Sequence, residues 1–126
     1  MSLRPRIALL AVLALALAAA ALPSLAGASP DVHAAGKCHL SQGEQRGGLG
    51  ATYTVKLRVS GTSCGTGKSV AHGFNNCRRS HKAKKCHPSG YRCHESHVTN
   101  SPAQRSARVS CRKGGARVKF AYTQNK

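Results

Sequence analysis

The sequence predicts a small α+β protein in which one helix packs on a mainly antiparallel four-stranded sheet, in the order strand, helix, strand, strand, strand. Three observations predict this class. Apolar and polar residues alternate in the segments 52–60 and 107–122, as is typical of half-buried strands. Apolar residues recur at helical spacing between these segments. Six cysteines can supply the disulfides that so small a core needs.

The chain begins with the pattern of a secretory signal peptide. Arg4 and Arg6 precede an apolar run over residues 7–22, and Ala26-Gly27-Ala28 forms a small-residue cleavage site. The run is shorter than the roughly 20 residues that a transmembrane helix needs. We therefore expect a signal peptide over residues 1–28 and a mature chain without a transmembrane segment. Its localisation is then extracellular, in solution or associated with the cell wall, where cysteines are oxidised.

The chain is strongly basic. It carries 20 Lys and Arg against 3 Asp and Glu, a formal net charge of +17, and all but two of the basic residues follow the leader. Such a field attracts polyanions over about a Debye length, ~8 Å at physiological salt. The charge therefore indicates an anionic partner. The alternative explanation is that the charge serves only to keep the protein soluble.

The first part of the mature chain gives no periodic signal. Residues 29–50 are rich in Gly, Ser, Gln and Ala, which predicts a flexible N-terminal arm anchored by Cys38. The disulfide-rich domain is expected over residues 51–126. In its first strand, alternation predicts a buried face made of Tyr53, Val55, Leu57 and Val59.

A helix is expected after this strand. Ser63 is suited to the N-cap position, and Val70, Phe74 and Cys77 follow at i, i+4 and i+7. The spacing predicts a helix over about 64–79 with one buried stripe. Glycines inside this segment weaken the prediction, since each costs up to about 1 kcal/mol in a helix interior.

Gly114-Gly115 predicts a two-residue hairpin turn between two alternating segments, because glycine tolerates the positive φ that such turns require. With this turn as the loop, Cys111 faces Val118 on the buried side and Arg112 faces Arg117 on the other. A further strand near residues 90–95 joins the hairpin if Cys93 meets Cys111.

The six cysteines allow fifteen pairings, and the sequence alone cannot choose among them. Geometry ranks them. Cys93 with Cys111 fits a cross-strand link, Cys77 with Cys86 closes a short loop at the helix end, and Cys38 with Cys64 remains by elimination. Each such bond typically stabilises a small domain by about 2–4 kcal/mol.

A glycine-rich segment at residues 61–69 looks like a phosphate-binding loop but has the wrong spacing. Five residues separate Gly61 from Gly67, whereas the motif needs four between its first glycine and the Gly-Lys pair. We therefore expect no nucleotide as a partner.

The seven histidines raise the question of a metal ion. No Cys-x-x-Cys pair is present, which excludes the common zinc and haem attachment patterns. With the cysteines oxidised, only imidazoles could bind copper or zinc, for example His94 and His97 with His81 or His87. We assign no metal site and no cofactor.

A catalytic site is also poorly supported. Glycoside hydrolysis usually needs paired carboxylates, and only Glu95 lies in a predicted element. The one enzyme class kept as an alternative is a small secreted ribonuclease that uses Glu95, His94, His97 and Arg108. We assign no catalytic residue and expect a non-enzyme.

Basic residues gather in two places. One is the segment between Cys77 and Cys86, and the other is the predicted outward face of the sheet. The candidate binding residues of the first are Arg78, Arg79, Lys82, Lys84 and Lys85. Those of the second are Lys56, Arg58, Arg92, Arg108, Arg112, Arg117 and Lys119.

These clusters predict a monomer that binds an anionic polymer or surface, such as a cell-wall polymer, a glycan or a nucleic-acid backbone. Tyr53, Tyr91, Phe120 and Tyr122 all fall on predicted inner faces, so we expect no ring to stack on a base and binding directed at the backbone. A secreted inhibitor or partner-binding module is a further alternative.

Several segments together resemble small secreted cysteine-containing proteins predicted in actinobacterial genomes. They are Thr62-Ser63-Cys64, Gly90-Tyr91-Arg92-Cys93, residues 108–115 and residues 118–122. The resemblance covers about residues 52–123 and implies an extracellular α+β protein. It implies no catalytic residue, because the group has no established activity, and Cys38, Cys77 and Cys86 need not be shared by its members.

Overall fold

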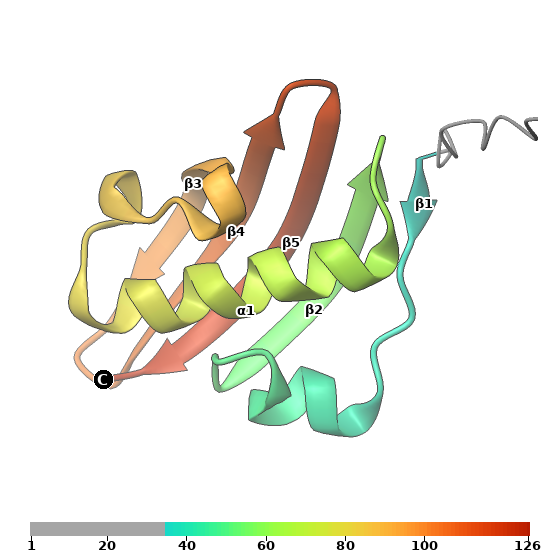
Figure 1. Ribbon diagram of the computed structural model, residues 1–126. Helices are drawn as coiled ribbons and strands as arrows, with labels where there is room; N and C mark the ends of the chain where they lie inside the picture. Colours follow the sequence, from blue (N-terminus) through green and yellow to red (C-terminus); the bar gives the residue numbers. More distant parts are fainter. Residues whose placement is uncertain (1–34) are drawn as a thin grey trace, which may run out of the picture.

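The computed structural model describes residues 35–126 (Figure 1). The signal peptide expected over residues 1–28, and residues 29–34 of the expected arm, lie outside the described residues. The strands are β1 (Gly36–Lys37), β2 (Tyr53–Ser60), β3 (Arg92–Asn100), β4 (Gln104–Lys113) and β5 (Ala116–Asn125). The helix α1 spans Cys64–Ser80, and the short helical turns are η1 (Glu44–Gly48), η2 (Ala83–Lys85) and η3 (Pro88–Gly90).

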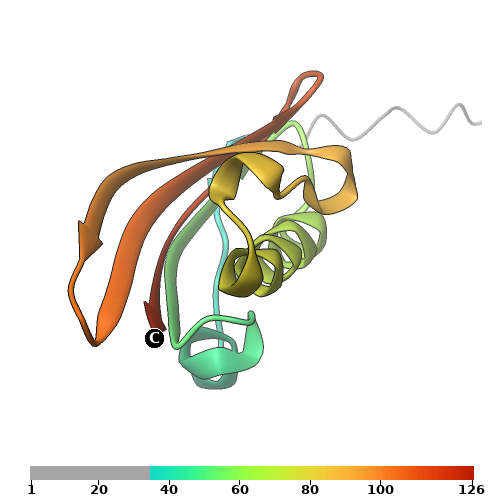
Figure 2. The ribbon, with the colours of Figure 1, turned by 90° about the vertical axis from the view of Figure 1, so that its left-hand side faces the viewer.

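The five strands form one sheet in the order β1-β2-β5-β4-β3, with every neighbouring pair antiparallel. The sheet is curved, and α1 and the helical turns lie on one side of it (Figure 2). The α+β class with one main helix is therefore confirmed. The expected number of four strands is corrected to five, because β1 has only two residues and so leaves no alternating pattern in the sequence.

The β4–β5 hairpin has the expected register. Cys111 pairs with Val118 and Arg112 with Arg117, and Gly114 in the turn has a φ of 54°. A positive φ at this position is readily adopted by glycine, which explains why the sequence located the turn. The preceding strand β3 also pairs with β4 through Cys93 and Cys111. It runs further than expected, to Asn100.

Helix α1 begins after Ser63, whose Oγ accepts a hydrogen bond from the Thr66 amide at 3.1 Å. Its buried stripe includes Val70 and Phe74, which are both fully shielded from solvent. The Phe74 ring packs edge-on against Phe120, with 5.9 Å between the ring centroids. Hydrophobic burial along this stripe fixes the helix on the sheet. Within residues 35–126, α1 and the shorter helices lack the length and apolarity of a membrane span.

Three disulfides link the described residues, in the pairs that geometry ranked first. Cys38–Cys64 ties the segment after β1 to the start of α1, and Cys77–Cys86 closes the loop after α1. Cys93–Cys111 connects the neighbouring strands β3 and β4. No described cysteine is free. Every cysteine is thus a structural link between neighbouring elements.

The described part of the expected flexible arm is packed, which corrects that expectation for residues 35–50. Gly36 pairs with Val59 in the sheet, and Leu40 and Leu49 belong to the buried core. The Asn75 side chain in α1 donates a hydrogen bond to the Leu49 carbonyl at 2.8 Å. Two leucines nine residues apart in a polar stretch have neither helical nor strand spacing, so the sequence pattern did not reveal this packing.

A β-bulge in β2 changes which residues face the core. The pairing with β5 shifts register between Val55 and Arg58, and Lys56 has a φ of 59°. Because a bulge inserts one extra residue, the alternation of faces is broken at this point. Thr54 is therefore buried, whereas Tyr53 is 45% exposed. The predicted inward position of Tyr53 and Val55 is wrong for this reason.

Candidate functional site

The sheet face opposite α1, here called the outer face, carries most of the exposed basic side chains. No described helix covers it. Cross-strand pairing arranges these residues in rows, since partners on neighbouring strands point to the same side. Arg92, Arg112 and Arg117 form one row across β3, β4 and β5. The exposed basic residues of the face are Lys37, Lys56, Arg58, Arg92, Arg108, Arg112, Arg117 and Lys119.

No carboxylate lies among the described residues of the outer face. Glu44 is in η1 and pairs with Lys68 of α1 at 2.7 Å, and Glu95 points to the opposite side of the sheet. Like charges directly opposite each other on a sheet destabilise it unless an anion or solvent screens them. The facing pair Arg112 and Arg117 is such a case. The outer face is therefore an uncompensated cationic surface.

The outer face is hollowed at its centre. Two adjoining shallow pockets, of about 350 and 280 Å³, share His97, Arg108 and Ala121. The first is also lined by Lys56 and Lys119. The second is completed by Tyr53, Val55 and Thr123. Basic side chains and small apolar residues thus line one continuous hollow.

Strained backbone marks both margins of this hollow. Lys56 in β2 and His97 in β3 have φ values of 59° and 50°, and the pairing of each strand shifts register there. A left-handed conformation at a residue other than glycine costs about 1–3 kcal/mol and often occurs at functional sites. Bulges are likewise found where a strand re-aims a side chain. Here the two bulges bring Lys56 and His97 to the same hollow.

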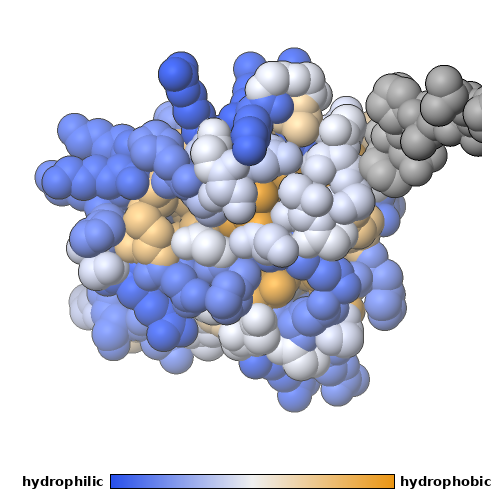
Figure 3. All heavy atoms as spheres, in the orientation of Figure 1, coloured by the Kyte–Doolittle hydropathy of each residue, from blue (hydrophilic) through white to orange (hydrophobic). Residues whose placement is uncertain are grey.

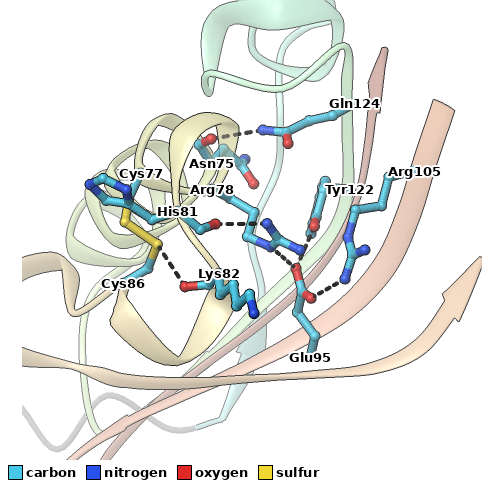
Figure 4. A network of polar contacts seen from close by, with 10 residues as sticks. All are labelled: Asn75, Cys77, Arg78, His81, Lys82, Cys86, Glu95, Arg105, Tyr122 and Gln124. Carbon is cyan, nitrogen blue, oxygen red and sulfur yellow. Dashed lines mark hydrogen bonds and ion pairs between the residues drawn. A yellow bond between two sulfur atoms is a disulfide. The ribbon is translucent and has the colours of Figure 1, made fainter. Parts of the chain in front are cut away.

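On the other side of the sheet, Glu95 is the centre of a polar network (Figure 4). Its carboxylate accepts hydrogen bonds from Arg78 Nε at 2.8 Å, from Arg105 Nη2 at 2.6 Å and from the Tyr122 hydroxyl. Only 7% of the Glu95 side chain is exposed. The network joins α1, β3, β4 and β5, so its role is structural.

The network lowers the pKa of Glu95 and raises the pKa of Tyr122. Burial acts to raise the pKa of Glu95, but the hydrogen bonds from Tyr122, Arg78 and Arg105 outweigh it and hold that pKa below its ordinary value of 4.5. Burial, together with the bond to Glu95, raises the pKa of Tyr122 to about 12. Glu95 is therefore ionised and Tyr122 neutral at physiological pH.

The basic segment between Cys77 and Cys86 is divided by the structure. Arg78 is committed to Glu95 and also donates to the His81 carbonyl at 2.7 Å. Arg79 is exposed but donates to the Gly50 carbonyl at 3.2 Å. The remaining cations of the segment, Lys82, Lys84 and Lys85, are exposed in and around η2.

The basic segment and the outer face lie on different sides of the sheet. Turn η2 packs on the side of α1, beside the edge strand β3. This side is mostly hydrophilic, with only small hydrophobic patches between polar side chains (Figure 3). The two groups of candidate residues therefore do not form one flat surface.

The residues named for a ribonuclease are not brought together. Glu95 and His94 are neighbours on β3 and so point to opposite faces. His97 and Arg108 share the outer hollow, while Glu95 is enclosed by its three partners on the inner side. Within residues 35–126, no three metal-ligating side chains come close enough to hold an ion.

Three residues of the outer face were missed by sequence reasoning. Lys37 joins the face by pairing with Arg58, but a two-residue strand leaves no signal in the sequence. Tyr53 and Val55 join it because of the bulge at Lys56, and a lysine gives no indication of a left-handed backbone.

Comparisons with protein-family models, with curated proteins and with solved structures give no match. The fold and the site define a disulfide-linked α+β protein, with one helix on the inner face of a five-stranded antiparallel sheet and basic residues on the outer face.

Proposed function

We propose that this protein is a secreted module that binds anionic polymers through the outer face of its sheet. Secretion is supported by the leader pattern of residues 1–28 and by the oxidised state of all six cysteines. The observation that carries the proposal is the set of eight exposed Lys and Arg side chains defined above as the basic residues of the outer face. Six of them stand in two cross-strand rows, and no described carboxylate lies among the eight. The rows are Arg92–Arg112–Arg117 and Lys37–Arg58–Lys119.

The arrangement suits a repeating anion better than a single small one. Rows of cations on neighbouring strands repeat at about the 4.7–4.9 Å spacing of a sheet. A flexible polymer can follow such rows and contact several cations at once. Its binding is then dominated by electrostatics and falls as salt rises.

The test separates the outer face from overall charge. The triple variant Arg112→Glu, Arg117→Glu, Lys119→Glu reverses the charge of three cations of the face, two beside the β4–β5 turn and one in the hollow. The matched control Lys82→Glu, Lys84→Glu, Lys85→Glu makes the same change in net charge on the side of α1. All six side chains are exposed, so both variants are expected to fold.

On a heparin column, we expect the outer-face variant to elute at clearly lower salt than both the parent and the control. Equal elution of the two variants would mean that only net charge matters. Earlier elution of the control would place the binding site in the Cys77–Cys86 loop instead.

A further inference from the structure

Tyr53 is the one aromatic side chain of this protein that is open to a ligand. Phe74, Tyr91, Phe120 and Tyr122 are all buried, with at most 4% of each exposed. Tyr53 is 45% exposed and lines the outer hollow. These five residues are all the aromatic residues of the chain.

The hollow next to Tyr53 combines apolar and cationic groups. Val55 and Ala121 are cross-strand partners and form an apolar part of its lining. Arg108 of β4 is exposed and is the second cross-strand partner of Ala121. Lys56 and Lys119 line the adjoining pocket. A ligand bound in this hollow therefore contacts an aromatic ring, an apolar surface and several cations at the same site.

This combination matches the parts of a nucleotide chain. An exposed ring offers a stacking surface for a base, and the basic groove can track the phosphates. A sulfated glycan carries the charge, but its saturated rings offer only C–H groups to pack on the ring and not the flat π-face of a base. In a duplex the faces of the bases are already stacked on one another, so only an unpaired strand offers one to Tyr53.

We propose that the anionic polymer bound by the outer face is single-stranded nucleic acid, and that Tyr53 stacks on one of its bases. This rests on the proposed function, since the cations of the same face bind the phosphates. Arg108 and Lys119 hold the backbone beside Ala121, and a base turns toward Val55 and Tyr53. Recognition is without sequence preference, because every base has a face that can stack.

Three probes of similar length test the proposal by fluorescence anisotropy. They are a labelled 12-nucleotide oligo(dT), an abasic strand with the same number of phosphates, and a labelled heparin oligosaccharide. The proteins are the parent, Tyr53→Ala, Tyr53→Phe and the matched control Val98→Ala. Val98 is also 45% exposed but does not line the hollow.

We expect Tyr53→Ala to weaken oligo(dT) binding at least fivefold, as the loss of one stacked base does. Its binding to the abasic strand and to heparin is expected to stay unchanged. Tyr53→Phe keeps the ring and should bind oligo(dT) like the parent, as should Val98→Ala. Tyrosine fluorescence gives a second readout, because a stacked base quenches Tyr53 while Tyr91 and Tyr122 are buried.

The outcomes distinguish the two proposals. If Tyr53→Ala leaves oligo(dT) binding unchanged, or weakens all three probes equally, stacking is wrong although polyanion binding stands. If the parent binds the abasic strand as tightly as oligo(dT), the base is not recognised and the inference is also wrong. If the parent binds none of the three probes, both proposals are overturned.

Discussion

Arg78 on α1 and Glu95 on β3 form an ion pair with 2.8 Å between Nε and Oε1, which ties the last turns of the helix to an edge strand of the sheet. Edge strands have only one neighbour, so β3 depends on such contacts to stay in place. The pair also explains why β3 carries an inward-facing carboxylate where an apolar residue is usual: the carboxylate binds Arg78, Arg105 and Tyr122 together.

Replacing Glu95 by Gln is predicted to destabilise the fold by about 2–4 kcal/mol at pH 7. The amide lacks the charge that compensates two arginines, whose side chains are only 15% and 23% exposed. The free energy of unfolding from urea titration measures the loss. Glu44→Gln is the control, because the Glu44–Lys68 pair is more exposed and its removal should cost clearly less. Equal losses in the two variants would show that the Glu95 network adds nothing beyond a surface pair.

The same network predicts that the free energy of unfolding decreases at acidic pH. The pKa of Glu95 in the folded state lies below its ordinary value of 4.5, so the unfolded chain takes up the proton first as pH falls. The stabilisation is therefore present above about pH 4.5 and is lost as pH drops through the lowered folded-state pKa. The parent and Glu95→Gln should differ most near neutrality and converge in strong acid. Urea titrations from pH 2 to 7 test this, and a constant difference would contradict it.

Gly67 is predicted to be required for the close approach of α1 to β2. A Cβ at this position would lie 2.5 Å from Val59 Cγ1, so Gly67→Ala must push the helix away or strain the core. We expect a loss of about 1–3 kcal/mol despite the better helix propensity of alanine. The matched control is Gly65→Ala, whose Cβ meets nothing nearer than Ser63 Oγ at 3.7 Å. Thermal unfolding should show this control unchanged or slightly more stable, and a stabilised Gly67→Ala would refute the packing argument.

The elements predicted correctly are those that local physics determines. Ser63 and the spacing of Val70 and Phe74 predicted α1, and Gly114-Gly115 predicted both the turn and the register of the β4–β5 hairpin. The register also placed Cys111 on the buried face, where a cross-strand link to Cys93 was possible, and the structure has this link.

The features that were missed depend on contacts between distant segments. Strand β1 forms because β2 offers an unpaired edge and Cys38 binds Cys64, neither of which leaves a local pattern. The bulge at Lys56 is imposed by the pairing of β2 with β5. It moved Tyr53 to the outer face, so the sequence predicted the charge of the candidate site but not its aromatic residue.

The Cys38–Cys64 bond is predicted to support both stability and the outer face. The double variant Cys38→Ser, Cys64→Ser should cost about 2–4 kcal/mol, because the bond closes a loop with a sequence separation of 26. It should also release β1, so the hydrogen bond from the residue 38 amide to the Leu57 carbonyl loses its protection from hydrogen exchange.

Release of β1 removes Lys37 from its position opposite Arg58. We therefore expect the double variant to elute from heparin at lower salt than the parent, by the same amount as Lys37→Ala, which keeps the disulfide. A larger shift in the double variant would mean that the bond positions more of the outer face than Lys37. No shift in either variant would show that β1 lies outside the binding surface, since displacing a cation that contacts the polymer must weaken salt-dependent binding.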